Sequence, residues 1–316
     1  MNVTNKERAT LCPVCHTVST QPYYSGNQVV VEDFVHRHGE YFYCQHCQIL
    51  FQDPPFIVSE LSPELIQAEV INQNPLGTGT LIGHIYSLYY RFTRRAIVHL
   101  RRLTPLRLLD VGCGTGQFCK TVSAYYEAWG VDSSPQACEV ARSYGLKNIV
   151  CDTFRRELFD LKFNVITFWQ TIEHLESSPL EALQTAFDLL EPGGILYIGE
   201  VPNINGMEFR VFGARCFYLA SPVHNYIFSE YFFTTSLSQI GFKEIKIRHD
   251  WKNYTLLSGS FMIKLQDWLG IKLSATTRLL MALVTYPGWA LLNVIVAWQK
   301  KSATFSIMAL KPGQKL

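Results

Sequence analysis

Two hydrophobic periodicities alternate along residues 105–253. Short apolar runs that end in glycine or an acidic residue predict strands, and segments with apolar positions three or four residues apart predict helices. The expected strands are residues 107–111, 128–131, 148–151, 163–168, 195–199, 243–248 and 304–310. The expected helices are residues 117–128, 135–144, 179–191 and 229–240. This alternation predicts a doubly wound α/β fold with a mostly parallel sheet.

The regions outside this core have different patterns. Residues 10–52 are rich in Cys, His and Tyr and predict short strands and turns, whereas residues 60–104 predict helix, with an arginine-bearing helix at 91–102. We therefore expect five parts along the chain. They are a cysteine module (1–57), a helical cap or linker (58–104), the α/β core (105–253), an apolar helical insert (254–302), and the final strand of the core with a tail (303–316).

The insert contains an uncharged segment, residues 279–298, that is long enough to span a bilayer. A single crossing would separate the strand at 304–310 from its own sheet, and Pro287-Gly288 should interrupt a helix, so we expect a helical hairpin. Tryptophans and cations around it favour peripheral contact with a membrane surface, while a lid and a dimer surface are the alternatives. These residues are Lys264, Trp268, Lys272, Arg278, Trp289, Trp298, Lys300 and Lys301.

Composition narrows the class of protein. The 316 residues are 48% hydrophobic and carry a net charge of only +2, which is globular and argues against a dedicated nucleic-acid partner. The first ten residues lack the apolar run of a signal peptide, and nine cysteines do not suggest a disulfide framework. We expect a cytoplasmic enzyme, associated with the cytoplasmic face of a membrane if the insert binds there. The oligomeric state stays open.

A glycine turn follows the first core strand. Gly112, Gly114 and Gly116 allow a sharp turn and a close approach of the backbone to a ligand. The dinucleotide fingerprint requires a further glycine where this chain has Gln117. Asp110 would repel a pyrophosphate but suits a cationic ligand, such as an aminoacyl ammonium beside a sulfonium.

The segment from Leu108 to Gly116 resembles the first motif of class I S-adenosylmethionine-dependent methyltransferases. Four further features follow in the family's order: Asp132, Asp152, the block at 163–175 and the turn at 190–198. The resemblance implies a Rossmann-like sheet whose last strand is antiparallel, and methyl transfer from S-adenosylmethionine. It implies cofactor contacts from Asp110, Gly112, Cys113, Gly114, Gly116, Asp132, Ser133, Asp152, Thr153 and Gln170.

Three residues are candidates for the catalytic base: Glu173 and His174 after the fourth strand, and His224 beyond the fifth. In some quinone-pathway and small-RNA methyltransferases, a Glu-x-x-Glu-His sequence and a later histidine hold a divalent metal. This chain has Gln170 in place of the first glutamate, which weakens affinity for a hard cation. A structural or cofactor-supporting role for these residues is the alternative.

Two Cys-x-x-Cys pairs lie in the N-terminal module. Cys12 and Cys15 precede Cys44 and Cys47 by 28 intervening residues, and four thiolates at such spacing predict a tetrahedral structural zinc site. Similar ribbons precede methyltransferase domains in sugar-modifying and ribosomal-RNA enzymes, so the module does not identify the substrate.

Together these observations predict methyl transfer to a small-molecule acceptor, either lipid-linked or sugar-containing. A methyltransferase of ribosomal or transfer RNA is one alternative, favoured by the ribbon and the arginine-bearing helix. A cofactor-binding module without catalysis is the other. The acceptor atom, whether oxygen, nitrogen or carbon, is not predicted because all three occur on this fold.

Overall fold

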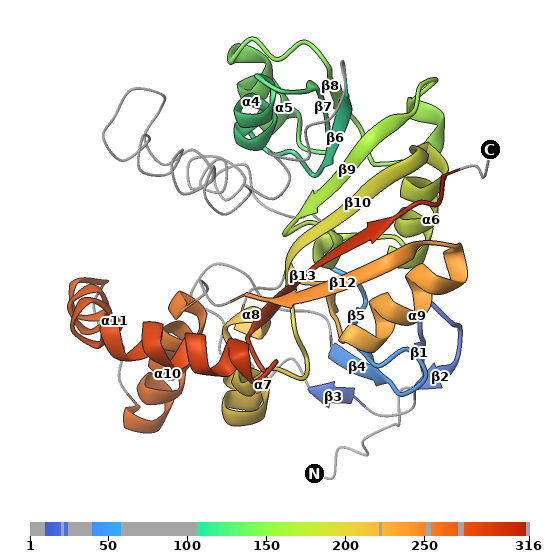
Figure 1. The fold of residues 1–316 in the computed structure, drawn as a ribbon. Helices are drawn as coiled ribbons and strands as arrows, with labels where there is room; N and C mark the ends of the chain where they lie inside the picture. The colour runs from blue at the N-terminus through green and yellow to red at the C-terminus, as the bar shows by residue number, and fades with distance from the viewer. Residues whose placement is uncertain are drawn as a thin grey trace.

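The computed structural model describes residues 10–19, 22–24, 40–57, 106–220, 223–250, 254–270 and 275–313. At its centre lies a seven-stranded sheet with the order β12-β13-β10-β9-β6-β7-β8 (Figure 1). Its strands are β6 (Arg107–Val111), β7 (Glu127–Asp132), β8 (Ile149–Cys151), β9 (Phe163–Trp169), β10 (Leu190–Pro202), β12 (Lys243–His249) and β13 (Thr304–Leu310).

The sheet confirms the predicted fold class. Strands β6 to β10 pair in parallel, and β13 runs antiparallel to both of its neighbours, β10 and β12. The central β9 is buried along nearly its whole length, as expected for a parallel strand covered on both faces. The edge strand β12 alternates exposed and half-buried residues and carries Lys243, Lys246 and Arg248, charges that discourage further strand pairing.

Helices cover the sheet where their capping residues predict them. Helix α5 (Pro135–Ser143) begins after Ser134, whose side chain accepts a hydrogen bond from Ala137 N, and α9 (Glu230–Ile240) begins after Ser229 in the same way. Helix α6 (Pro179–Leu189) lies beside α9 (Figure 1). Helix α4 (Gln117–Val122) is shorter than predicted, because a turn precedes β7, where Glu127 N bonds to Leu106 O.

The loops at the carboxyl ends of β9 and β10 contain short elements that the pattern did not reveal. A 3-10 turn, η4 (Ile172–His174), follows β9. After β10 come α7 (Met207–Phe212), the 3-10 turn η5 (Gly213–Arg215), α8 (Phe217–Ala220) and β11 (Tyr226–Ile227). Another 3-10 turn, η3 (Arg156–Leu158), follows β8. These connections build the candidate site.

The N-terminal residues form two small sheets. Strands β1 (Thr10–Leu11) and β2 (Val18–Ser19) pair with each other, and β3 (Pro22–Tyr24), β4 (Glu40–Cys44) and β5 (Ile49–Asp53) form a second sheet. The fourth strand of that second sheet is β11, which pairs with β5. Phe42 and Phe51 share one apolar cluster with Phe228 and Phe232, so the module packs directly into the core.

The apolar insert corrects one prediction. Residues 279–298 lie within a single helix, α11 (Ala275–Trp298), and Pro287-Gly288 does not divide it. The hairpin forms instead between α11 and α10 (Tyr254–Leu269), where the rings of Phe261 and Trp289 lie 5.5 Å apart. Packing between the helices offsets the roughly 3 kcal/mol that a proline costs inside a helix. No helix in the described part of the chain is long and apolar enough to cross a membrane. The predicted helical cap at 58–104 lies outside the described residues.

Candidate functional site

The turn after β6 needs glycine for two reasons. Gly112, Gly114 and Gly116 have φ values of 69°, 51° and 74°, in the left-handed region. A Cβ on Gly112 would also lie 2.3 Å from Cγ2 of Thr171, so no side chain fits there. Thr171 follows β9, and the turn is therefore packed tightly against the neighbouring loop.

Two acids hold this turn in shape. Asp110 is buried, and one of its oxygens accepts a 2.6 Å hydrogen bond from Thr167 Oγ1. Asp132, at the end of β7, accepts one hydrogen bond from Gly114 N at 2.8 Å and another from Ser134 N at 2.9 Å. Burial raises the pKa of Asp132. Cys113 sits beneath the turn, in the space that a Cβ on Gly130 would fill.

Two other predicted cofactor contacts lie after β8. Asp152 forms a two-pronged ion pair with the Arg155 guanidinium at 2.7 and 2.6 Å, and this ion pair lowers the pKa of Asp152. Thr153 donates its backbone N–H to the same carboxylate at 2.7 Å. Asp152 is therefore already engaged by a neighbouring cation, which the sequence pattern did not suggest.

Gln170 and Glu200 form a strained pair at the ends of β9 and β10. Their φ values are 48° and 61°, which are uncommon for residues other than glycine and tend to occur at functional sites. Gln170 Nε2 donates to Glu200 Oε2 at 3.2 Å. Glu200 was not predicted from the sequence, although an acidic residue directly after the expected strand at 195–199 is the same signal that identified Asp132.

The three candidate bases lie together. Glu173, His174 and His224 each offer a ligand atom, and these atoms all lie within 4.8 Å of one another. The two imidazole rings are 4.7 Å apart. Fifty residues separate the histidines in sequence, so their contact is a product of the fold.

Burial sets the protonation of this group. His174 Nδ1 donates to Val223 O at 2.7 Å, which leaves Nε2 with its lone pair, and burial lowers the pKa of the imidazole. Burial also raises the pKa of Glu173 to about 8. The site therefore holds a neutral imidazole beside a carboxyl group that favours its protonated form at neutral pH.

Tyr218 completes this side of the site. Its ring meets His224 edge-on at a centroid distance of 5.2 Å, and its buried hydroxyl has no hydrogen-bond partner among the described residues. Tyr218 was not predicted from the sequence, because it lies in α8, a four-residue helix with no recognisable motif.

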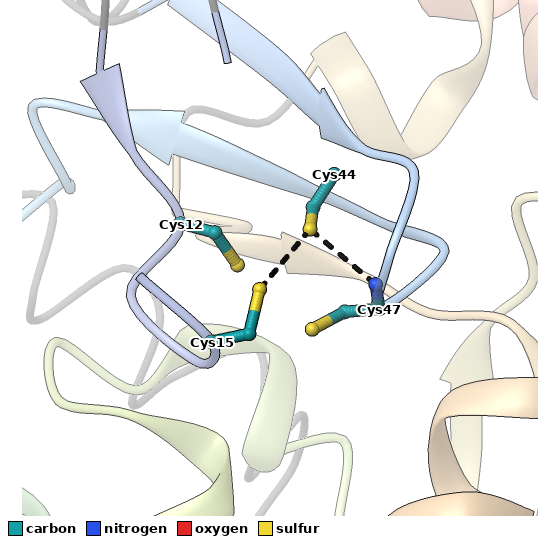
Figure 2. Close-up of side chains that lie close together, drawn as sticks. All are labelled: Cys12, Cys15, Cys44 and Cys47. Atoms are coloured by element: carbon teal, nitrogen blue, oxygen red, sulfur yellow. Dashed lines mark hydrogen bonds between the residues drawn. The ribbon is translucent and has the colours of Figure 1, made fainter. Parts of the chain in front are cut away.

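The four predicted metal-binding cysteines also converge. Figure 2 shows Cys12, Cys15, Cys44 and Cys47 around one point, and their Sγ atoms all lie within 4.8 Å of one another. The two pairs sit on matching turns, closed by hydrogen bonds from His16 N to Cys12 O and from Gln48 N to Cys44 O. A hydrogen bond with Cys47 lowers the pKa of Cys12 to about 5, so one thiolate is favoured within the group.

The fold and the glycine turn define a Rossmann-like protein with an acidic site at the carboxyl ends of its strands. The profile of the methyltransferase domain family matches residues 84–246, just over half of the chain. The chain belongs to this family, which confirms the class of enzyme that the sequence predicts.

Individual relatives are distant. The ubiquinone biosynthesis O-methyltransferase of Chelativorans sp. is 27% identical over 118 residues, covering 35% of this chain and 46% of that protein. The probable tRNA methyltransferase 9B of Bos taurus is 32% identical over 93 residues, covering 29% and 20%. A crystal structure of an S-adenosylmethionine-dependent methyltransferase from Archaeoglobus fulgidus has a TM-score of 0.47 and 21% identity, covering 71% of this chain and 93% of that one. The chain spans about half the length of the ubiquinone-biosynthesis relatives it matches.

The raised pKa of Glu173 predicts a pH-dependent stability. The folded-state pKa of about 8 exceeds the ordinary 4.5. Below pH 4.5 Glu173 therefore makes its full contribution to the stability of the folded state, and this contribution is lost as the pH rises through 8. Across this pH range, the free energy of unfolding of the parent should fall by on the order of 4 kcal/mol relative to that of Glu173→Gln. Urea unfolding of both proteins in the same buffers at about pH 5, 7 and 9 measures the difference.

The matched control is Glu176→Gln, which changes an exposed carboxylate three residues away. It should follow the parent protein at every pH. A constant difference between the parent and Glu173→Gln would show that Glu173 is not buried in the way described.

Proposed function

We propose that the protein transfers a methyl group from S-adenosylmethionine to a small, lipid-linked acceptor. The observation that carries this proposal is the arrangement at one edge of the sheet, where an acidic glycine turn and a half-buried neutral imidazole follow neighbouring strands. The names of the ubiquinone-biosynthesis relatives agree with a lipid-linked acceptor.

The residues around the turn fit this cofactor. Asp110 and Asp132 place two carboxylates at the glycine turn, a charge that opposes a pyrophosphate and suits the cationic amino-acid end of S-adenosylmethionine. Both oxygens of Asp132 keep lone pairs for the ribose hydroxyls. In this proposal Cys113 and Ser133 line the same cofactor site. Asp152 and Thr153 lie beside the adenine, and Gln170 contacts the methionine part of the cofactor.

When bound, the cofactor supplies a methyl group activated by its sulfonium. The chain must then align the acceptor and exclude water, and an oxygen acceptor must also lose a proton. The free Nε2 of His174 is suited to accept that proton, with His224 beside it. Burial favours the protonated form of Glu173, so we assign it a hydrogen-bonding role and assign the role of base to His174.

The same three residues form a second candidate site, for a divalent cation. Their ligand atoms are close enough for shared coordination. Gln170, which donates to Glu200, supplies no second carboxylate at the expected position. This replacement favours the metal-free role.

We also propose that the four-cysteine cluster binds structural zinc. The thiol sulfurs of Cys15 and Cys44 lie 3.5 Å apart, a separation suited to two ligands of one tetrahedral ion. The module is too small to build a core of its own, so metal binding would supply part of its folding free energy.

The exposed face of α11 suggests where a lipid-linked acceptor is met. Val284, Leu291 and Trp298 are 80%, 64% and 85% exposed and lie on one side of the helix, while Asn293 on the opposite side is only 1% exposed. A soluble helix usually buries its apolar side. We therefore propose that this apolar face lies on a membrane surface.

Cations border this face where α11 meets β12. An open groove of about 620 Å³ is lined there by Arg248, Lys300 and Trp298, and Lys301 is also exposed. Such a border attracts the phosphate groups of anionic lipids, and tryptophan favours the interface between lipid and water. A cytoplasmic enzyme bound peripherally to a membrane agrees with these features.

The test of the function uses labelled methyl groups. Purified protein with methyl-labelled S-adenosylmethionine and an extract of the source cells should place label in the organic phase. Asp132→Ala should weaken cofactor binding in calorimetry by about tenfold to a hundredfold, because hydrogen bonds to a charged group are lost. Asp160→Ala, which changes an exposed acid away from the turn, is the matched control.

Label found outside the organic phase would point to a different function. Label in RNA would replace the small-molecule acceptor with the RNA alternative. Label in the aqueous small molecules would favour a sugar-containing acceptor and make the insert a lid. Cofactor binding without transfer to any fraction would leave a binding module without catalysis.

The zinc proposal predicts about one equivalent of metal per chain by elemental mass spectrometry. Cys44→Ser should lose most of this zinc, because the site would retain only three thiolates. Cys151→Ser alters a thiol outside the cluster and should retain it. Parent protein that neither contains zinc nor takes it up from solution would contradict the proposal.

The membrane proposal predicts that the protein floats with vesicles containing phosphatidylglycerol. Replacing both Leu291 and Trp298 with Gln should reduce the bound fraction at least several-fold, because apolar area is lost from the contact. Tyr231→Gln removes an exposed aromatic ring from α9 and should bind as the parent does. Vesicle-free protein that forms stable dimers through this face would instead assign it to a second copy of the chain.

A further inference from the structure

A single buried amide connects three segments around the imidazole pair. Asn225 Nδ2 donates to the carbonyl oxygens of Phe56, His174 and Leu175 at 3.0, 3.2 and 3.2 Å. Its Oδ1 accepts from Phe56 N at 2.6 Å. Phe56 belongs to the N-terminal region, and Asn225 directly follows His224. One side chain therefore ties the end of the cysteine module to the loops that carry both histidines.

Tyr41 makes a second connection from the same module. It lies on β4 and is buried, and its hydroxyl donates to His224 O at 2.6 Å. Next to it, β5 pairs with β11: Phe51 lies opposite Tyr226 and Leu50 opposite Ile227. Gln52 N extends this pairing with a 2.9 Å hydrogen bond to Asn225 O. The segment that carries His224 is thus held as an added strand of the N-terminal sheet.

The cysteine cluster is built on the other end of the same hairpin. Cys44 is the last residue of β4, and the turn through Cys47 leads directly into β5. Tyr41 precedes Cys44 by three residues on that strand. Coordination of the four thiols would therefore fix the hairpin whose other residues contact the His224 segment.

We propose that the four-cysteine module braces the imidazole pair, and that Tyr41 and Asn225 are the positioning residues through which it acts. This inference rests on the proposed function for the catalytic importance of the histidines, but the brace itself is a structural claim. The described residues of the module contribute no side chain to the three-residue cluster of Glu173, His174 and His224. It acts on the backbone from which both rings project, and His174 Nδ1 is fixed in turn by Val223 O.

The experiment follows the imidazoles themselves. Protein with ¹³C-labelled histidine is studied by NMR, and the signals of His174 and His224 are assigned from single His→Gln variants. Tyr41→Phe removes only the hydroxyl that bonds to His224 O, and we expect it to shift or broaden both signals. Removing the metal from the parent with a strong chelator should move the same signals.

Two controls make the result specific. Tyr43→Phe makes the same change two residues further along β4, where the ring packs against Tyr23, and should leave both signals in place. His249 is an internal control, because both of its ring nitrogens are bonded, to Glu230 and Ser302, and neither partner belongs to the module. Its signal should be the same in every sample.

The kinetic consequence separates positioning from general loss of structure. With the acceptor identified from the labelled extract, Tyr41→Phe should lower kcat several-fold and leave the affinity for S-adenosylmethionine within about twofold, because the hydroxyl that is removed bonds to the His224 segment and the glycine turn is held by Asp132 and Thr171. Unchanged imidazole signals in both Tyr41→Phe and the metal-stripped parent would overturn the brace. The NMR measurement needs no acceptor, so its failure is distinct from failure of the proposed function.

Discussion

The parallel pairing of β6 with β7 and β9 brings together the central part of the candidate site. Strands that run in the same direction end at the same edge, and so the turn at Gly112, Asp132 and the loop after Trp169 meet there. The contact is close enough that Thr171 occupies the space of a side chain on Gly112. The glycine turn, the two acids beside it and the loop that carries His174 all depend on this one arrangement, because a change in strand order would separate them. His224 reaches them through the pairing of β11 with β5.

Local sequence signals predicted the part of the site that local geometry controls. The glycine turn and Asp132 could be identified because each follows directly from an apolar strand, and the cysteine pairs because their spacing matches a known ligand geometry. The contact between His174 and His224 could be suggested only by family resemblance, since it depends on a path of fifty residues. Glu200 follows the expected strand at 195–199 and carried the same signal as Asp132, although it was not predicted. Tyr218 carried no such signal, because a hydroxyl without a partner among the described residues is visible only in three dimensions.

The corrected hairpin shows how tertiary packing overrides a local rule. Pro287-Gly288 predicted a break in the apolar segment, but α11 continues through it and packs on α10. Strand β11 is the opposite case: two residues with no strand signal of their own become a strand because β5 presents an edge to them. In both cases the deciding partner is distant in sequence, beyond the reach of periodicity.

The junction between α11 and β13 links the apolar face to the site. Asn203, which follows β10, donates to Ser302 O at 2.9 Å, and its backbone pairs with Ala303 O at the same distance. Met207 N bonds to Lys301 O at 2.8 Å. The helix that ends at Trp298 is therefore joined, within a few residues, to the strand and loop that lead on to the His224 segment. A membrane contact at α11 would then orient the acceptor side of the sheet, while the cysteine module supports that side from the opposite end of the chain.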